Sequence, residues 1–353
     1  MIGHALAGLA LSLALSLALL LGLSHDLRAQ AISTGCPATP SRHWEAVVPG
    51  VWVWPGAAED INPDNHGHVA SQVLIARGRS ATLIDPGPGL AHGLAVIESA
   101  RCELGLDVNR VLDSHAHAEN VLGNAAFLPR QGMTARLEAT PTTRAAMTER
   151  CAACSASIAR AAADPALAAT PIVLPEPSLA NGQRWDSDAG SWLTLEFRSA
   201  HSESDLAWWN ERERLLIAPG LIYQDRLPEL AQGSWLGWIA ALRELHRLQP
   251  TRVAGQSPGS SRGLQATYRY LCDLGQAVRR ALESGQSAAE ASRIEWPAHA
   301  GSAEWAGWAG HAERHGFNLQ RAWRELEPLW IQGDPLACPA LDPDPQLQMS
   351  SGN

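Results

Sequence analysis

The chain has 353 residues, 46% of them hydrophobic and 18% charged, a composition that indicates a folded globular protein with one large core or two modest ones and excludes a disordered chain. Its formal net charge is −9, and all 27 of its basic side chains other than histidine are arginine. The lack of lysine excludes a lysine Schiff base and a P-loop lysine, and the acidic balance argues against non-specific binding to nucleic acid.

The N-terminus carries an apolar stretch from Ala5 to Leu23 that is interrupted only by small residues. The sequence Ala29-Gln30-Ala31 follows, and this small-x-small pattern is typical of a signal-peptide cleavage site. We therefore predict a signal peptide over residues 1–31, and a periplasmic or secreted mature protein that has no membrane contact after cleavage. The alternative is an uncleaved anchor, because the stretch is nearly long enough to span a bilayer.

After a loop-like segment over residues 32–47, short strand signals follow one another: VWVW, then VASQVLIARG with alternating apolar positions, then SATLIDPG. Residues 91–104 have the apolar spacing of a helix. The next stretch, VNRVLDS, predicts another short buried strand. It places His115 at the carboxyl end of that strand, the edge at which sites usually form in layered α/β proteins.

A second strand-rich half follows a predicted helix over residues 140–163, which begins with Thr140 as its cap and Pro141 as its first residue. The strands of this half are SWLTLEFRSAH, DLAWWNERERLLIAPG and TRVAG, and a helix over 234–248 separates the last two. Two successive strand-rich halves, each followed by helices, predict an α/β protein built as a four-layer αβ/βα sandwich.

Further helices are predicted over 262–284 and 303–329. We divide the chain at the boundaries of five segments: signal peptide 1–31, N-terminal loop segment 32–47, main α/β domain 48–290, helical C-terminal extension 291–334, and a tail, 335–353, that is rich in proline and aspartate and is predicted to be disordered. Whether the extension completes a pocket or docks a partner stays open.

The six cysteines are an even number, and in an exported protein all of them could form disulfides. Cys151 and Cys154 form a CxxC in a predicted helix, where a local disulfide or two packed thiols is favoured over a redox motif or half of a zinc knuckle. Most of the 14 tryptophans lie in apolar strands or helices, so we expect packing roles for them, including the adjacent Trp208 and Trp209.

Three histidines form a candidate metal site. His115 and His117 are separated by one residue, so both can point to one side of an extended turn, and His201 follows the strand LTLEFRSA. Zinc suits such a set because it accepts neutral imidazole in tetrahedral geometry. His66 and His68 form a second HxH, which would recruit a second ion or contact substrate, although isolated loop histidines usually have solvent roles.

The chain resembles the metallo-β-lactamase superfamily over about residues 48–330, and most closely its exported branch called quinoprotein relay system zinc metallohydrolases. The resemblance rests on GVWVWPG, on TLIDPGPG and on SHAHAENVLGNAAF, where the family pattern reads HxHxDHxxGNxxF. It continues through SAHSESDLAWW, LIYQDRLPEL, GSWLGWIAALREL, VAGQSPG and RHGFNLQRAWRELE. It implies a metallo-β-lactamase sandwich over residues 48–290 and a zinc-dependent site.

His115, His117 and His201 match the three histidines of the family's first metal site, so the resemblance implies one zinc ion bound by them. The four family positions of the second site (the aspartate and last histidine of the motif, the bridging aspartate and the final histidine) are all changed, and the residues there are Glu119, Asn120, Gly220 and Gln256. Glycine has no side chain to bridge two ions, and amide oxygens are poor zinc ligands beside imidazole. A second ion is therefore not expected.

We predict from these residues a mono-zinc hydrolase that activates water for attack on an ester, thioester or amide-type carbonyl. Glu119 would orient that water or take its proton as the catalytic base, although Asp205 and Glu203 also lie close to His201 in the sequence, and Glu119 is alternatively an exposed acid on a loop. Asp85 keeps a family position that supports the first motif structurally.

The alternative hypothesis is a non-catalytic binding or accessory protein that serves a periplasmic quinoprotein dehydrogenase system. The four changed positions favour this alternative, and the three retained histidines oppose it. An antibiotic-degrading lactamase and a thioesterase of the glyoxalase II kind are both disfavoured, because those enzymes normally use ligands of the second site. The substrate is not specified by the sequence.

Overall fold

The computed structural model describes residues 35–36, 42–128, 135–230, 232–255, 258–260, 262–291, 293, 305 and 307–341. Residues 38–353 form one unit, and Met1–Pro37 form a separate one of which only residues 35 and 36 are described. The predicted signal peptide over residues 1–31 lies outside the described residues. Within the described part of the chain, no helix combines the length and the apolar character needed to cross a bilayer.

The first sheet contains the strands in chain order, β1 to β6. They are β1 (Glu45–Val48), β2 (Val51–Trp54), β3 (Gln72–Arg77), β4 (Ser80–Ile84), β5 (Asp107–Leu112) and β6 (Arg136–Glu138). The first four pair antiparallel, whereas β5 lies parallel to both β4 and β6. Helix α2 (Leu90–Leu104) supplies the crossover that a parallel pair requires between β4 and β5.

The second sheet has the order β12-β11-β10-β9-β8-β7. Its strands are β7 (Arg184–Ser187), β8 (Gly190–Arg198), β9 (Ser204–Asn210), β10 (Leu215–Ile217), β11 (Arg252–Ala254) and β12 (Pro258–Ser260). All neighbours pair antiparallel except β10 and β11, which are parallel and joined through α6 (Trp235–Arg247).

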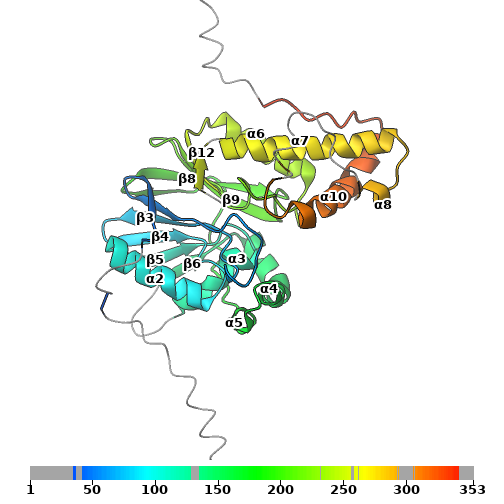
Figure 1. Cartoon of the computed structure of the whole chain (residues 1–353). Coiled ribbons are helices and arrows are strands. Elements are labelled where there is room, and N and C mark those ends of the chain that lie inside the picture. Colours follow the sequence, from blue (N-terminus) through cyan, green and yellow to red (C-terminus); the bar gives the residue numbers. More distant parts are fainter. Residues whose placement is uncertain are drawn as a thin grey trace, which may run out of the picture. The chain divides into compact units, whose positions relative to one another are not determined.

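The inner faces of the two sheets pack on each other through apolar side chains. Because successive residues of a strand face opposite sides, β9 directs Trp208 into the core between the sheets and Trp209 into the core under the helices. Both indoles are buried, as are most of the apolar strand residues, and the predicted packing role of this pair is confirmed. Figure 1 shows α2 over the outer face of the first sheet, and α6 and α7 (Arg262–Glu283) over the second. The predicted four-layer αβ/βα sandwich is confirmed.

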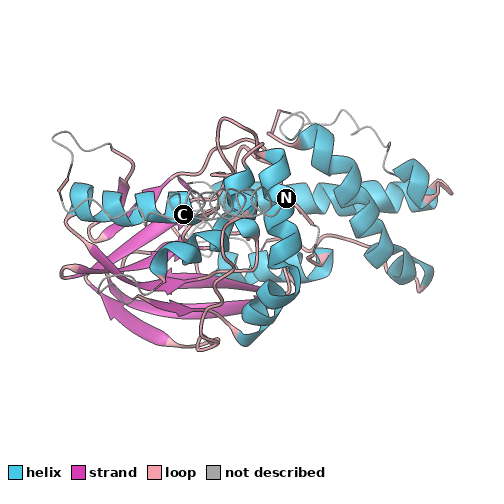
Figure 2. Ribbon diagram, turned by 90° about the horizontal axis from the view of Figure 1, so that it is seen from below, coloured by secondary structure: helices cyan, strands magenta, loops and turns pink. Residues whose placement is uncertain are grey.

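Further helices lie between and after these elements along the chain. They are α3 (Ala118–Val121), the 3₁₀ helix η1 (Leu122–Phe127), α4 (Pro141–Ala161), α5 (Pro165–Ala168), α8 (Ala288–Ala291) and α10 (His311–Ile331). As predicted, Thr140 caps α4 by accepting a hydrogen bond from the backbone N–H of Thr143. In Figure 2, the helices extend well beyond the strands on the side where α7 and α10 lie.

Helix α10 belongs to the same hydrophobic core as α6 and α7. Its Leu319, Trp323 and Leu326 are buried in that core. The carboxylate of Glu325 accepts hydrogen bonds from the hydroxyl of Ser234 and from the first backbone N–H groups of α6, at 2.6–3.0 Å. The helical extension therefore caps a helix of the main domain, which is a favourable place for a negative charge.

The tail was predicted to be disordered from residue 335, and this prediction is wrong for residues 335–341. Leu336 is only 3% exposed, and Cys338 forms a disulfide with Cys272 of α7. These two contacts hold the segment on the folded unit in spite of its proline- and aspartate-rich composition. Residues 342–353 lie outside the described part.

Candidate metal centre

The three predicted histidines come from the carboxyl ends of strands in both sheets. β5 ends at Leu112, and His115 and His117 follow in a short loop, where His117 also forms the cap position of α3. His201 lies in the turn between β8 and β9. The backbone N–H of Leu206 in β9 donates a 2.9 Å hydrogen bond to the carbonyl of Ser114, which joins the two halves beside the histidines.

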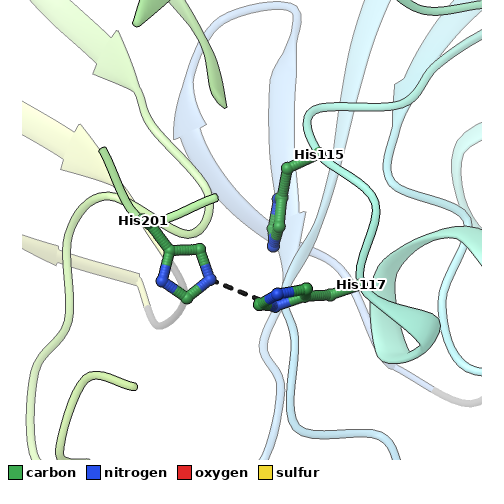
Figure 3. Close-up of side chains that lie close together, drawn as sticks. All are labelled: His115, His117 and His201. Carbon is green, nitrogen blue, oxygen red and sulfur yellow. Dashed lines mark hydrogen bonds between the residues drawn. The ribbon is translucent and has the colours of Figure 1, made fainter. Parts of the chain in front are cut away.

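The three imidazoles converge. Each offers one ligand nitrogen, and these nitrogens all lie within 4.8 Å of one another. Nε2 of His201 faces Nδ1 of His117 at 3.1 Å, as the dashed line in Figure 3 marks. In a tetrahedral site with metal–nitrogen distances of about 2.0–2.1 Å, ligand nitrogens are roughly 3.4 Å apart. The observed set therefore fits one zinc ion with small side-chain adjustments.

The electrostatic setting favours neutral rings. His115 and His201 are each 1% exposed. Burial, followed by the neighbouring His117, lowers the pKa of both residues well below the usual histidine value. A neutral imidazole keeps the lone pair that a metal requires, so the donor set fits zinc chemically as well as geometrically.

Hydrogen bonds from behind determine which nitrogen of His115 faces the centre. The hydroxyl of Ser114 donates to Oδ2 of Asp85 at 2.6 Å, so it must accept from Nδ1 of His115, 2.8 Å away. The carboxylate of Asp85 also accepts from the backbone N–H of Ser114 at 2.8 Å. Nε2 of His115 is left free for an ion. Such partners fix the tautomer and orientation of a metal-binding histidine.

Asp85 is completely buried, and burial raises its pKa to about 6 in spite of the hydrogen bonds from Ser114 and Asn120. The side-chain amide of Asn120 donates to Oδ2 of Asp85 at 2.8 Å. Asn120 stands where the family pattern has a metal-binding histidine, and here it holds the carboxylate that supports His115. The predicted structural role of Asp85 is thus observed, with Asn120 as an additional partner.

His117 has its own supporting partner, which the sequence did not predict. Its Nε2 lies 2.9 Å from the side-chain oxygen of Gln232, which can only accept a hydrogen bond. Nε2 therefore carries the hydrogen, and the lone pair of Nδ1 points toward His201. The partner lies 115 positions away in the sequence, so no local pattern could have indicated it.

Gly220 lies directly against the centre. It has a φ of +70°, and a Cβ atom there would come within 2.9 Å of both Cε1 of His115 and Cδ2 of His201. Real Cβ contacts are essentially never this short. Gly220 therefore has two effects. It lacks the carboxylate that would bridge to a second ion, and it leaves the space in which the two imidazoles approach each other.

The acidic residues near the centre have different surroundings. Glu119 lies in the first turn of α3, two residues after His117. Burial raises the pKa values of Tyr223 and Glu229, and the nearby Glu119 adds to both shifts. Asp205 is buried and accepts hydrogen bonds from the backbone and hydroxyl of Ser202, at 2.8 and 2.9 Å.

Burial raises the pKa of Asp205 to about 6, and its contacts show that it shapes the turn carrying His201. Glu203 forms an ion pair with Arg150 at 2.6 Å. Contacts with Ser202 and Arg150 explain Asp205 and Glu203 structurally. The described contacts give Glu119 no comparable structural role.

Two residues of the stretch LIYQDRLPEL reach the centre although sequence reasoning assigned them no role. The hydroxyl of Tyr223 is 3.5 Å from Nε2 of His201, and burial raises the pKa of Tyr223, so the hydroxyl stays protonated. Arg226 is 4% exposed and pairs with Asp60 at 3.9 Å. After burial, His117 and His115, its charge contributes to the lowered pKa of His201. The quoted similarity of this stretch to the family was the one signal that could have indicated them.

Helix α10 holds this stretch in place. The side-chain amide of Asn318 accepts from the backbone N–H of Leu230 at 2.9 Å and donates to the carbonyl of Pro228 at 2.8 Å. Arg321 donates to the carbonyl of Gly233 at 2.7 Å. The C-terminal extension therefore positions the loop that carries Gln232.

The second HxH does not join the three histidines. His66 is exposed and forms an ion pair with Asp164 at 3.5 Å, and His68 contacts Gln72. Among the described residues, His115, His117 and His201 are the one group of three or more histidine, cysteine or acidic side chains whose ligand atoms lie this close together. Gln256 lies outside the described residues.

Cys151 and Cys154 are free thiols, in agreement with one of the two favoured interpretations of the CxxC. Burial raises the pKa of Cys151 to about 12 and also raises that of Cys154. Both thiols are therefore protonated and poorly reactive at neutral pH.

No protein-family model and no curated protein matches the sequence. Solved structures match the fold. A metallo-β-lactamase from Pontibacter korlensis aligns with 15% identity and a TM-score of 0.51, over 65% of this chain and 97% of its own. One from Hirschia baltica aligns with 16% identity and a TM-score of 0.50, over 66% and 98% of the two chains.

A metallo-β-lactamase from Pseudomonas aeruginosa in its mono-zinc form aligns with 14% identity and a TM-score of 0.50, over 68% of this chain and 97% of its own. The chain therefore has the metallo-β-lactamase fold, and it carries a cluster of three histidines suited to a metal ion. At these identities the likeness concerns the fold.

Proposed function

We propose that the protein is a mono-zinc hydrolase that cleaves an ester, thioester or amide-type bond. The convergence of three imidazoles supports this proposal most directly, because three protein ligands leave one position of a tetrahedral zinc site open. The proposed zinc ion supplies Lewis acidity and an activated water molecule in a site of this kind. The neighbour from Pseudomonas aeruginosa, crystallised in a mono-zinc form, supports a single ion as compatible with the fold.

The residues of the chain divide the remaining work. His115 and His117 are oriented by Ser114 and Gln232, so Nε2 of His115 and Nδ1 of His117 present lone pairs without a change of tautomer. Glu119 accepts the proton of the attacking water, as its place two residues after His117 allows. The protonated hydroxyl of Tyr223 can donate a hydrogen bond to the carbonyl oxygen on which negative charge develops.

A non-catalytic accessory protein of a periplasmic quinoprotein system is the second candidate. The observation in its favour is Gly220, which removes the bridging ligand and packs against two of the histidines.

We further propose that the protein is exported. The disulfide between Cys272 and Cys338 supports this, because structural disulfides persist in oxidising compartments.

The test measures zinc content and turnover on the same mature protein. Zinc is counted by mass spectrometry, and activity is assayed with an aryl ester, an aryl thioester and a chromogenic β-lactam. In protein purified without added zinc, we expect about one tightly bound zinc ion per chain, turnover of the ester or thioester, and loss of both that ion and turnover in His117→Ala.

Glu119→Gln should retain zinc and lower kcat by about 10²- to 10⁴-fold. Glu203→Gln is the matched control, because it neutralises a nearby acid that is paired with Arg150, and it should retain activity. One zinc ion without turnover of any substrate would favour the accessory protein. Turnover that survives in His117→Ala would contradict the metal-dependent mechanism.

A further inference from the structure

A second group of histidines packs around Trp54. His68, in the loop over residues 55–71 between β2 and β3, and His92, in the first turn of α2, have ring centroids 4.2 Å apart. Both pack against Trp54, at centroid distances of 5.6 and 5.1 Å. The sequence singled out His68 only as part of an HxH, and gave His92 no role.

The two rings converge on a single oxygen atom. Nε2 of His68 and Nε2 of His92 each lie 2.9 Å from Oε1 of Gln72. The amide of Gln72 is fully buried, and its nitrogen donates to the carbonyl of Ala70 at 2.7 Å, which fixes the oxygen toward the rings. Each nitrogen therefore lies at a distance from the amide oxygen that neighbouring ligands of one small ion can have.

The backbone is shaped to admit this arrangement. Gly87 has a φ of +93°, and a Cβ atom there would lie 2.2 Å from Cδ2 of His92. The imidazole of His92 thus occupies the space that any other residue at position 87 would fill. Both histidines are half-buried.

Burial disfavours the charged form of both rings. Burial lowers the pKa of His68 to about 4 and that of His92 well below the usual histidine value. Neutral imidazole is the form that zinc, nickel and copper bind. A nearby third histidine, His43, stacks on Trp54 and is paired with Glu103, so it is already engaged.

We propose that Nε2 of His68, Nε2 of His92 and Oε1 of Gln72 form a second site for a divalent transition-metal ion, separate from the three-histidine centre. Without the ion, both rings donate their Nε2 hydrogens to the amide oxygen. When the ion binds, the single hydrogen of each neutral ring moves from Nε2 to Nδ1, so that both Nε2 lone pairs bind the ion, and the ion links the 55–71 loop to α2. An amide oxygen is a weaker ligand than a third imidazole, so this site binds less tightly than the first. The proposal is independent of the hydrolytic function.

The test uses zinc alone, with the first centre removed by His115→Ala and His117→Ala in the full mature chain. At micromolar free zinc this double variant should still bind about one zinc ion per chain, and zinc should raise its Tm. Adding His92→Phe, which keeps a ring against Trp54, should abolish both effects. Adding His66→Ala, in the same loop and exposed, should abolish neither.

Gln72→Glu provides a second test in the double variant, because a carboxylate in place of the amide should tighten zinc binding by about tenfold. If removal of the first centre prevents folding, the comparison is made between the unsubstituted protein and His92→Phe, with a loss of one zinc ion expected. Zinc content that is the same with and without His92→Phe would overturn the proposal. So would a folded double variant that binds no zinc, whatever the activity of the first centre.

Discussion

At the scale of single residues, Gly220 has the most direct influence on the candidate metal centre. Alanine at this position requires a strained backbone at φ +70° and a Cβ atom 2.9 Å from each of two imidazoles. We expect Gly220→Ala to lose most of its zinc and to lower the free energy of unfolding by about 1–3 kcal/mol. Zinc content and urea denaturation check this.

Gly182→Ala is the control for backbone strain, because Gly182 has a φ of +81° and no neighbouring atom within 4 Å of the added Cβ. It should lose stability and keep its zinc. Equal zinc content in Gly220→Ala and the unsubstituted protein would show that the imidazoles can move apart without loss of binding.

The hydroxyl of Ser114 links Asp85 to His115, because it donates a hydrogen bond to the carboxylate and accepts one from the imidazole. Ser114→Ala leaves Nδ1 of His115 without this acceptor, so the ring can change its tautomer and orientation. We expect zinc affinity to fall by about 10- to 100-fold in titration calorimetry. Ser99→Ala, which removes a buried hydroxyl from α2, should leave the affinity unchanged. An unchanged affinity in Ser114→Ala would assign Asp85 a role in folding alone.

The sequence identified the three histidines because each follows a strand whose carboxyl end forms the same edge. It did not identify Gln232 or Tyr223, since neither has a spacing that indicates a ligand or an acid. Both reach the histidines only because α10 and α7 hold their loop against the second sheet. The effect of Gly220 was predicted only as a missing ligand, because steric space depends on what the fold places beside it.

At the scale of secondary structure, the longer strands and the helices predicted over 91–104, 140–163, 234–248 and 262–284 are confirmed, because their apolar periodicity extends over several residues. The helix predicted over 303–329 begins later, at His311, and the described residues 307–310 before it are not helical. The strands β1, β6, β7 and β12 were not predicted, and each has only three or four residues. A segment this short cannot show a convincing alternation, and its pairing depends on a neighbouring strand that local sequence does not specify.

Helix α10 contains a buried titratable residue whose effect on stability depends on pH. Burial, together with the neighbouring His311, lowers the pKa of His315 to about 4, from 6.5 in an unfolded chain. Between these values the unfolded chain binds the proton and the folded chain does not, so stability is full above pH 6.5 and falls as the pH approaches 4. The loss from this residue is at most about 3 kcal/mol.

We therefore expect His315→Phe to show a smaller loss of stability between pH 6.5 and pH 4 than the unsubstituted protein. Urea denaturation at several pH values measures the difference in slope. His315 is 7% exposed, so the phenyl ring also tests whether this position accepts an apolar side chain. Parallel pH profiles for the two proteins would show that His315 does not carry this dependence.

At the scale of the whole molecule, the C-terminal extension is part of the folded unit and supports the candidate centre. Its helix contributes Glu325 to the cap of α6 and Asn318 to the loop before Gln232. The composition of residues 335–353 suggested disorder, since proline and aspartate do not build a core. One disulfide and one buried leucine hold residues 335–341. Amino-acid composition alone predicts neither contact.

The disulfide between Cys272 and Cys338 closes a segment with a sequence separation of 66, and this segment contains α10. In the chain-entropy model, removing it releases the unfolded chain and lowers the free energy of unfolding by about 4 kcal/mol. We expect Cys338→Ser to show a loss of this order in urea denaturation, and to bind zinc more weakly because the loop before Gln232 rests on α10.

Cys154→Ser, which replaces a free and half-buried thiol, is the matched control and should change stability by less. The unsubstituted protein treated with a reductant should approach the stability of Cys338→Ser. If Cys338→Ser were as stable as Cys154→Ser, the buried core contacts of α10 alone would hold this helix. The disulfide would then give no reason for the protein to need an oxidising compartment.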